Sequence, residues 1–222
     1  TLTMTVSNSP CSPAADDMIL TIYDDPTADA GADADMCETD ITYTLSTAIA
    51  GTGTILWTTS GDGGFDNTAI ANPIYSPGAA DIAANTVTLT MTVSNAPCSP
   101  AADDMILTIY DTPTADAGAD ADICETATYQ LAGTAGTGTI LWTTSGDGTW
   151  DDDAIANPIY TPGTADIAGT NNTVTLTMTV SNAPCTDATD DIILTIYDVP
   201  TADAGTLTVD DMCETATYQL TG

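Results

Sequence analysis

The sequence predicts an all-β fold, a tandem array of β-sandwich domains with a repeat of about 87 residues. Three observations support this prediction. The octapeptide Thr-Leu-Thr-Met-Thr-Val-Ser-Asn occurs at residues 1–8, 88–95 and 175–182. Apolar and polar residues alternate with period two through most segments, which is the pattern of a half-buried strand. No stretch of the chain shows a convincing helical period.

The repeat sets the expected domain boundaries. The cysteine that follows each octapeptide also recurs every 87 residues, at Cys11, Cys98 and Cys185. A proline recurs at the same interval, at Pro26, Pro113 and Pro200. We therefore expect residues 1–24 to end one repeat, 25–111 and 112–199 to form two complete repeats, and 200–222 to begin a fourth. Trp57 and Trp142 are only 85 residues apart, and length changes of this kind belong in loops.

Each complete repeat is expected to contain about seven short strands. In segment 87–93, valine, leucine and methionine face one side and threonines face the other. In the second repeat the expected strands are 113–121, 126–132, 138–144, a pair near 150 and 158–161, 173–181 and 190–197. So many short strands in under ninety residues, with a tryptophan on the third, indicate an immunoglobulin-like sandwich.

Composition excludes several functions. The chain of 222 residues has no Lys, Arg or His and 32 acidic residues, so its formal net charge is −32. Nothing can neutralise phosphates, which excludes electrostatic binding to nucleic acid or to anionic lipid. Histidine bases, lysine Schiff bases and arginine clamps are also excluded. No run of 18 apolar residues is present, so we expect no membrane insertion, while 43% hydrophobic residues predict a folded chain.

Several motifs resemble a known family. They are the segment 113–125, Pro-Thr-Ala-Asp-Ala-Gly-Ala-Asp-Ala-Asp-Ile-Cys-Glu, the segment 141–148, Leu-Trp-Thr-Thr-Ser-Gly-Asp-Gly, the segment 160–167, and the threonine-rich strand before Cys185. Together they resemble the tandem Ig-like or PKD-like repeats of very large secreted surface proteins of Bacteroidetes, adhesins and gliding-associated proteins exported by the type IX route. The resemblance implies an extracellular stalk or adhesin at the bacterial cell surface and supplies no catalytic residues.

The cysteines are interpreted as disulfide partners in an oxidising compartment, because the chain has no histidine and no Cys-x-x-Cys motif. Small buried thiols are the alternative. In an Ig-like topology Cys37 and Cys98 lie near opposite ends of a domain, about 30 Å apart for nine-residue strands. A disulfide needs Cα atoms within about 7 Å. We therefore prefer an interdomain bond between Cys37 and Cys185.

Other pairings stay open at this point. Intradomain bonds Cys37–Cys98 and Cys124–Cys185 are the alternative, and bonds between separate chains are not excluded. Under the preferred pairing, Cys124 awaits a following domain and Cys98 a preceding one. The two remaining cysteines lie in the incomplete repeats, at Cys11 and Cys213.

Aspartates cluster where domains should meet and in loops expected at the same end of the sandwich. Ca²⁺ takes six to eight oxygen ligands from such loops, so these clusters are candidate calcium sites. The spacings match no complete EF-hand or RTX loop, and a solvated acidic face is the alternative. The candidate ligands are Asp24, Asp29, Asp33, Asp62, Asp66, Asp111, Asp116, Asp120, Asp147 and Asp151.

Catalysis, ice binding and sugar binding are the other functions that these residues suggest. Asp147 and Asp151 could form a glycosidase pair, but nothing in the chain can stabilise a developing anion with positive charge. Strand amphipathicity explains the threonine row of segment 87–93 better than ice binding does. A sugar-binding aromatic platform would use Trp57, Trp142, Tyr43 and Tyr129, although tryptophan on the third strand is usually core.

The sequence thus predicts a structural protein without enzymatic activity. We expect a rigid rod of Ig-like repeats, stiffened by disulfides and by interdomain calcium, that serves as a stalk or filament module. The alternative is a calcium-dependent adhesin that binds glycans or surfaces through the repeats. The expected partners are divalent cations and neighbouring copies of the protein in a filament or bundle, because cations screen the repulsion between acidic rods.

Overall fold

The computed structural model describes residues 1–168 and 172–202. Cys213 and nearly all of the expected fourth repeat therefore lie outside the described residues. The chain divides into two compact units. The first comprises Thr1–Thr112 together with Ala183–Cys185, and the second comprises Pro113–Asn182 with the residues from Thr186 onward. No helix among the described residues is long and apolar enough to cross a membrane.

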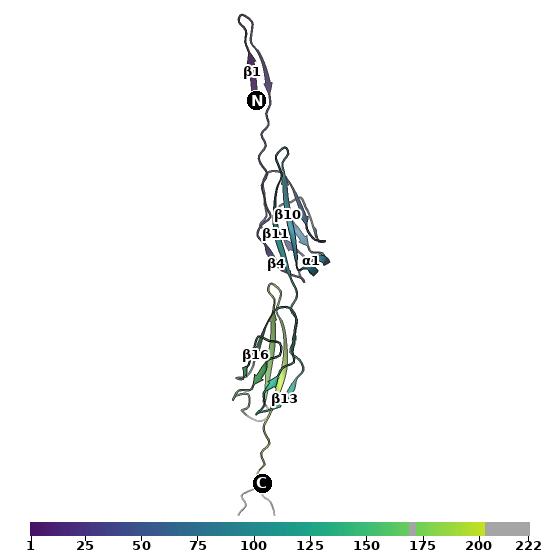
Figure 1. The fold of residues 1–222 in the computed structure, drawn as a ribbon, viewed down its shortest axis with the longest axis vertical. Coiled ribbons are helices and arrows are strands. Elements are labelled where there is room, and N and C mark those ends of the chain that lie inside the picture. Colours follow the sequence, from purple (N-terminus) through teal and green to yellow (C-terminus); the bar gives the residue numbers. More distant parts are fainter. Residues whose placement is uncertain (169–171, 203–222) are drawn as a thin grey trace, which may run out of the picture. The chain divides into compact units, whose positions relative to one another are not determined.

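The first complete repeat is a β-sandwich (Figure 1). Its larger sheet has the order β4-β11-β10-β7, in which β4 runs parallel to β11 and the other neighbours are antiparallel. The facing layer consists of the sheet β5-β9-β8 and the pair β3-β6. The elements are β3 (Ala28–Asp29), β4 (Ala34–Cys37), β5 (Tyr43–Thr44), β6 (Ile49–Ala50), β7 (Thr54–Thr59), β8 (Gly64–Phe65), β9 (Ile74–Ser76), α1 (Ala79–Ala84), β10 (Thr86–Ser94) and β11 (Ala101–Tyr110).

The second repeat has the same topology. Its larger sheet is β13-β20-β19-β16, with β13 parallel to β20, and it is faced by β14-β18-β17 and by the pair β12-β15. The strands are β12 (Ala115–Asp116), β13 (Ala121–Cys124), β14 (Tyr129–Gln130), β15 (Thr134–Ala135), β16 (Thr139–Thr144), β17 (Thr149–Trp150), β18 (Ile159–Thr161), β19 (Asn172–Ser181) and β20 (Ala188–Tyr197). The prediction of a tandem array of Ig-like sandwiches is confirmed.

Two details of the expected strands were wrong. The single strand expected at 113–121 is broken into β12 and β13, which belong to different sheets. Gly118 lies in the break with φ +95°, a left-handed conformation that favours glycine and ends the extended run. The short helix α1 was not expected, because six residues are too few to establish a helical period.

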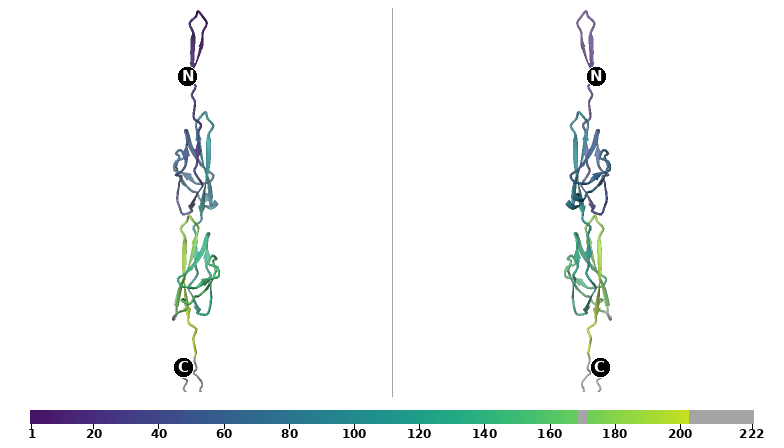
Figure 2. Two further views of the ribbon diagram at one scale, coloured as in Figure 1. Left: turned by 90° about the vertical axis from the view of Figure 1, so that its left-hand side faces the viewer. Right: turned by 90° about the vertical axis from the view of Figure 1, so that its right-hand side faces the viewer.

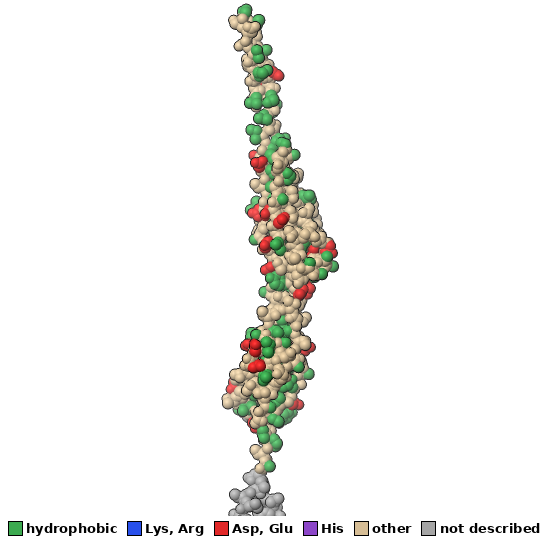
Figure 3. All heavy atoms as spheres, viewed as in Figure 1, with side chains coloured by type: hydrophobic (Ala, Val, Ile, Leu, Met, Phe, Trp, Pro, Cys, Tyr) green, Lys and Arg blue, Asp and Glu red, His purple; other side chains and the backbone are tan. Residues whose placement is uncertain are grey.

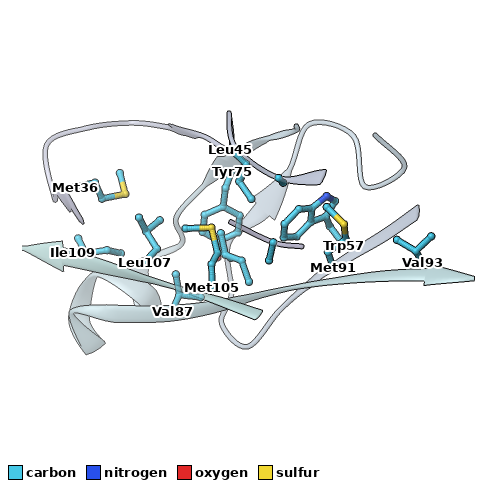
Figure 4. Packing of buried hydrophobic residues seen from close by; sticks show 13 residues of the cluster. Met36, Leu45, Trp57, Tyr75, Val87, Met91, Val93, Met105, Leu107 and Ile109 are labelled. Carbon is cyan, nitrogen blue, oxygen red and sulfur yellow. The ribbon is translucent and has the colours of Figure 1, made fainter. Parts of the chain in front are cut away.

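The core lies between the two layers of each sandwich. On β10, residues Val87 to Val93 alternate between buried and half-buried, so the predicted inward set is confirmed. Figure 4 shows Leu45 and Tyr75 of the smaller layer packed toward Met105 and Leu107 of the larger sheet. Burial of each such apolar side chain stabilises the fold by about 1.5–3 kcal/mol.

An aromatic ladder runs through each core. In the first repeat the ring of Phe65 lies between Trp57 and Tyr75, with centroid distances of 5.7 and 5.0 Å. In the second repeat tryptophan replaces phenylalanine, and the ladder is Trp142, Trp150 and Tyr160. The two third-strand tryptophans are fully buried, so they cannot form the sugar-binding platform considered above.

The N-terminal hairpin is different. Strands β1 (Leu2–Val6) and β2 (Ala14–Met18) pair antiparallel, and every residue in them is exposed. The hairpin has no facing layer among the described residues (Figure 2). Hydrophobic side chains therefore lie along its surface (Figure 3).

Candidate functional site

Cys37 and Cys185 form a disulfide, the pairing preferred from the sequence. The two residues are 148 positions apart, and their Cα atoms are 4.9 Å apart. Cys185 belongs with Ala183 and Pro184 to the first compact unit, although its neighbours in sequence belong to the second. The Cys185 Sγ lies 3.3 Å from the carbonyl oxygen of Tyr110, and Cys37 is almost completely buried. We call residues 183–185 the Ala-Pro-Cys turn.

Strand β4 positions Cys37 for this bond. Cys37 is the last residue of β4, which pairs parallel with β11 so that Cys37 lies beside Tyr110. Cys98 precedes β11 at its opposite end, and a ten-residue strand spans about 33 Å. The alternative intradomain bond Cys37–Cys98 is therefore out of reach in this topology, and Cys98 is a free thiol.

Glu38 fixes the backbone around the disulfide. Its N–H donates to the Tyr110 carbonyl at 2.9 Å, and its carboxylate accepts the Thr112 N–H at 2.8 Å. The hydrogen bond from the Thr112 backbone holds the pKa of Glu38 below its usual value. The Thr39 hydroxyl donates to the Cys37 sulfur at 3.2 Å. The role of Glu38 was not predicted, although a glutamate follows the cysteine in both complete repeats, at Cys37 and at Cys124.

The second repeat contains the same frame without a bonded partner. The Glu125 N–H donates to the Tyr197 carbonyl at 2.9 Å, and its carboxylate accepts the Val199 N–H at 3.0 Å. Cys124 pairs with Tyr197 as Cys37 pairs with Tyr110. Cys124 is a free, exposed cysteine, so the alternative bond Cys124–Cys185 is absent.

Cys98 lies in a turn like that of Cys185. Its thiol contacts the carbonyl oxygen of Tyr23 at 3.7 Å, and the Asn95 side-chain amide donates to the Asp24 carbonyl at 2.8 Å. Burial, with the acidic neighbours Asp25 and Asp24, raises the pKa of the Cys98 thiol. The third turn of this kind carries Cys11, which is free and exposed.

The two most buried carboxylates, those of Asp81 and Asp166, each accept hydrogen bonds from a tyrosine hydroxyl and from several backbone N–H groups. We call each of these hydrogen-bonded groups a latch. Asp81 is 2% exposed and accepts hydrogen bonds from the Tyr75 hydroxyl at 2.6 Å and from the backbone N–H groups of Asp62, Gly63 and Gly78. Desolvation opposes ionisation, but these hydrogen bonds prevail and lower the pKa of Asp81. Desolvation and the bond to Asp81 raise the pKa of Tyr75 to about 12.

The second repeat has the equivalent latch. The Asp166 carboxylate accepts from the Tyr160 hydroxyl at 2.6 Å and from the N–H groups of Asp147 and Gly163. Desolvation, with the hydrogen bond to Asp166, raises the pKa of Tyr160 to about 12. Because the chain has no cationic side chain, backbone N–H and tyrosine hydroxyl groups are the donors that hold these buried charges.

Most of the proposed calcium ligands also accept backbone N–H groups. Each of their side chains bonds a nearby turn or strand in this way: Asp29 to Gly31, Asp33 to Ile106, Asp62 to Ala80, Asp66 to Ile74, Asp116 to Gly118, Asp120 to Ile193, Asp147 to Ala165 and Asp151 to Ile159. No group of three or more Cys, Asp or Glu among residues 1–168 and 172–202 is arranged to hold a metal ion. Calcium binding at these residues, or at Asp24 and Asp111, stays a prediction.

The proposed glycosidase pair is used structurally. The Asp147 carboxylate accepts from Ala165 and Asp166, and the backbone bond from Ala165 is the main cause of its lowered pKa. The Asp151 carboxylate accepts the Ile159 N–H at 2.6 Å. Threonines 88, 90 and 92 lie on the outer face of β10, where they are only half-buried. This placement agrees with strand amphipathicity as the explanation of the threonine row.

Both complete repeats are therefore Ig-like β-sandwiches arranged in tandem. No family model and no curated protein matches the sequence. The fold is similar to solved tandem Ig structures. Sidekick-1 immunoglobulin domains 1–4 match with a TM-score of 0.53 and 12% identity over 81% of this chain and 51% of that one. Titin domains I67–I69 match with a TM-score of 0.51 and 11% identity over 78% of this chain and 66% of that one.

These similarities concern the fold alone. The chain spans about half the length of the Sidekick-1 structure and about two thirds of the titin structure. At these identities, evidence for function has to come from the residues of this chain.

Proposed function

We propose that the chain is a structural module of an extracellular bacterial surface protein, a stalk or filament built of Ig-like repeats and without enzymatic activity. The observation that carries the proposal is the Cys37–Cys185 disulfide, which closes a loop across two repeats. Structural disulfides persist in oxidising compartments, which supports a location outside the cytoplasm.

The disulfide changes how the chain transmits tension. A pulling force applied at the two ends follows the shortest covalent path, which enters at Cys37 and leaves at Cys185. The backbone between these residues is 148 residues long and contains most strands of both sandwiches, including β7, β10, β16 and β19. Tension can pull these strands apart only if the backbone between Cys37 and Cys185 is extended. The disulfide prevents that extension. The connectivity therefore suits a module that keeps its length under load.

The uniform negative charge supports the same function. With a net charge of −32 and no cationic side chain, separate modules repel each other at low ionic strength. Salt near 1 M reduces the screening length to about 3 Å, and divalent cations also screen the repulsion, so either allows close approach. We propose neighbouring copies, bridged or screened by cations, as the partners in a bundle.

Single-molecule force spectroscopy tests the mechanical function. The full chain, held by its ends, should extend further after reduction by about 500 Å, because 148 residues at about 3.4 Å each are released. The Cys37→Ser variant should behave like the reduced chain. The Cys124→Ser variant is the matched control and should keep the short extension.

The result that would contradict the proposal is equally clear. If oxidised and reduced chains extend to the same length, the disulfide carries no load and the mechanical function fails. Specific binding of the chain to a glycan array, with equal extension in both redox states, would favour the adhesin alternative.

A further inference from the structure

The first and second repeats present the same cysteine site in two states. In the first, Cys37 is 4% exposed and bonded to the Ala-Pro-Cys turn. In the second, Cys124 is exposed and free, and its neighbours Ile123 and Tyr197 are more exposed than Met36 and Tyr110. The surface of Cys124, Ile123 and Tyr197 is thus an uncovered copy of a surface that the turn covers elsewhere. We call it the Cys124 surface.

The frame that receives the turn is already formed at the Cys124 surface. Glu125 bonds the carbonyl of Tyr197 and the N–H of Val199 with the geometry that Glu38 has at Tyr110 and Thr112. In the first repeat the sulfur of Cys185 lies against the Tyr110 carbonyl. At the Cys124 surface the corresponding acceptor is the Tyr197 carbonyl. No rearrangement of the strands is therefore needed to accept a turn.

The equivalent turn at Cys98 contacts the equivalent carbonyl although it forms no disulfide. Cys98 is unbonded, yet its thiol lies 3.7 Å from the Tyr23 carbonyl, and Asn95 donates to the Asp24 carbonyl. Tyr23 occupies the position in its repeat that Tyr110 and Tyr197 occupy in theirs. A turn of this kind thus contacts the equivalent tyrosine carbonyl without a disulfide.

We propose that the Cys124 surface binds the Ala-Pro-Cys turn of a further repeat, joined after residue 199 as the second repeat is joined after residue 112, and that a disulfide to Cys124 closes the contact. This inference rests on the proposed structural function and names the partner of its open site. Because Cys124 lies between Cys37 and Cys185 in sequence, the new loop would overlap the existing one. Every repeat of a longer array would then lie within at least one closed loop.

Bond formation consumes two thiols. Each sulfur loses its proton and one electron, one S–S bond forms, and an added disulfide such as oxidised glutathione takes up both electrons and both protons to become two thiols. The required oxidant is thus a small disulfide or a disulfide oxidoreductase of the same compartment.

A duplicated chain tests the proposal. Residues 113–199 are placed twice in tandem before residues 200–222, and the added copy carries Thr186→Ser as a mass marker beside its cysteine. After refolding with oxidised glutathione and digestion with an Asp-directed protease, non-reducing mass spectrometry identifies the linked peptides. We expect Cys37 bonded to the unmarked Cys185 peptide and a Cys124 peptide bonded to the marked one, and Cys124→Ser in each copy in turn shows which Cys124 forms that bond.

Controls separate this inference from the proposed function. Cys124→Ser in the original copy should remove only the marked linkage and should leave the Cys37 linkage intact. If Cys37 is bonded but the original Cys124 stays free, bonds the unmarked peptide, or links to another molecule, the inference is overturned while the proposed function stands. If Cys37 is not bonded to Cys185 in the original chain without the duplication, the proposed function loses its basis.

Discussion

The N-terminal hairpin and the hairpin β10–β11 have nearly the same sequence but opposite surroundings. Leu2 pairs with Met18 as Leu89 pairs with Met105, so the two hairpins share one register. Leu2 is nevertheless 54% exposed, whereas Leu89 is fully buried, and Ile22 is 87% exposed where Ile109 is 1% exposed. The difference is the second layer, which covers β10–β11 and which none of the residues the structure describes forms over β1–β2.

The comparison separates pairing from burial. Alternating threonines and apolar residues, with a turn containing proline, are enough to define the hairpin and its register. The free energy of burial comes from segments that the hairpin sequence does not contain, such as Tyr75 on β9 and Leu45 directly after β5. A two-stranded hairpin alone is marginally stable in water. We therefore expect substitutions of residues buried between two layers to change stability more than substitutions in the uncovered hairpin.

The largest difference is expected from matched leucine truncations. Leu89→Ala removes a fully buried side chain and should lower the free energy of unfolding of the first repeat by about 2–5 kcal/mol. Leu2→Ala, at the equivalent exposed position, should change it by less than about 0.5 kcal/mol. Hydrogen exchange of the β10 amides at increasing urea concentration measures both. Equal effects would mean that the hairpin face is buried in solution.

The disulfide gives the next largest effect. Cys37→Ser should lower the stability of the first repeat by about 2–4 kcal/mol, because the bond closes a loop of 148 residues and constrains the unfolded chain. Cys124→Ser replaces a free exposed thiol and should leave the melting temperature unchanged. Calorimetry with and without reductant provides the measurement. A reductant effect of the same size in Cys37→Ser would contradict the assignment.

The buried latch predicts a pH-dependent effect. Asp81→Asn should cost the first repeat about 2 kcal/mol at pH 7, because buried N–H and hydroxyl donors lose an ionised acceptor. The pKa of Asp81 is lowered in the folded state, so its contribution is present above the usual pKa near 3.8 and disappears as pH falls below that value. Asp104→Asn, at an exposed position of β11, is the control and should have little effect.

Urea unfolding of wild type and Asp81→Asn at a series of pH values from 7 to 3 measures this contribution. The difference between the two proteins should shrink at the acid end of the series. A difference that is constant with pH would show that the carboxylate charge plays no part in the latch.

The smallest effect is expected from cations. Magnesium should raise the melting temperature of the chain modestly at low ionic strength, because screening relieves the self-repulsion of a net charge of −32. Thermal scans at matched ionic strength compare sodium, magnesium and calcium. A larger rise with calcium than with magnesium, abolished by Asp33→Asn and Asp120→Asn, would support the predicted calcium sites. Equal rises would assign the effect to screening.

Much of the site could be predicted from sequence because repeats supply internal controls. The spacing of Cys37, Cys98 and Cys185, with the length of an Ig-like strand, was enough to prefer one disulfide among the alternatives. The carboxylate roles were not predictable, because Asp-rich loops look the same whether they bind calcium or cap backbone N–H groups. Only the positions of the donors around residues such as Asp81 and Asp147 distinguish the two.

The sequence by itself determined the repeat, the alternating strands, the hairpin register and the lack of cationic chemistry, because these depend on local pattern and composition. Tertiary structure alone decided where each repeated residue lies. It buries Leu89 between two layers, whereas no described residue covers Leu2, and it bonds Cys37, whereas Cys124 has no bonded partner among the described residues. The physical reason is that burial and disulfide formation require a partner at a few ångströms, and a repeated sequence does not say which of its copies has that partner.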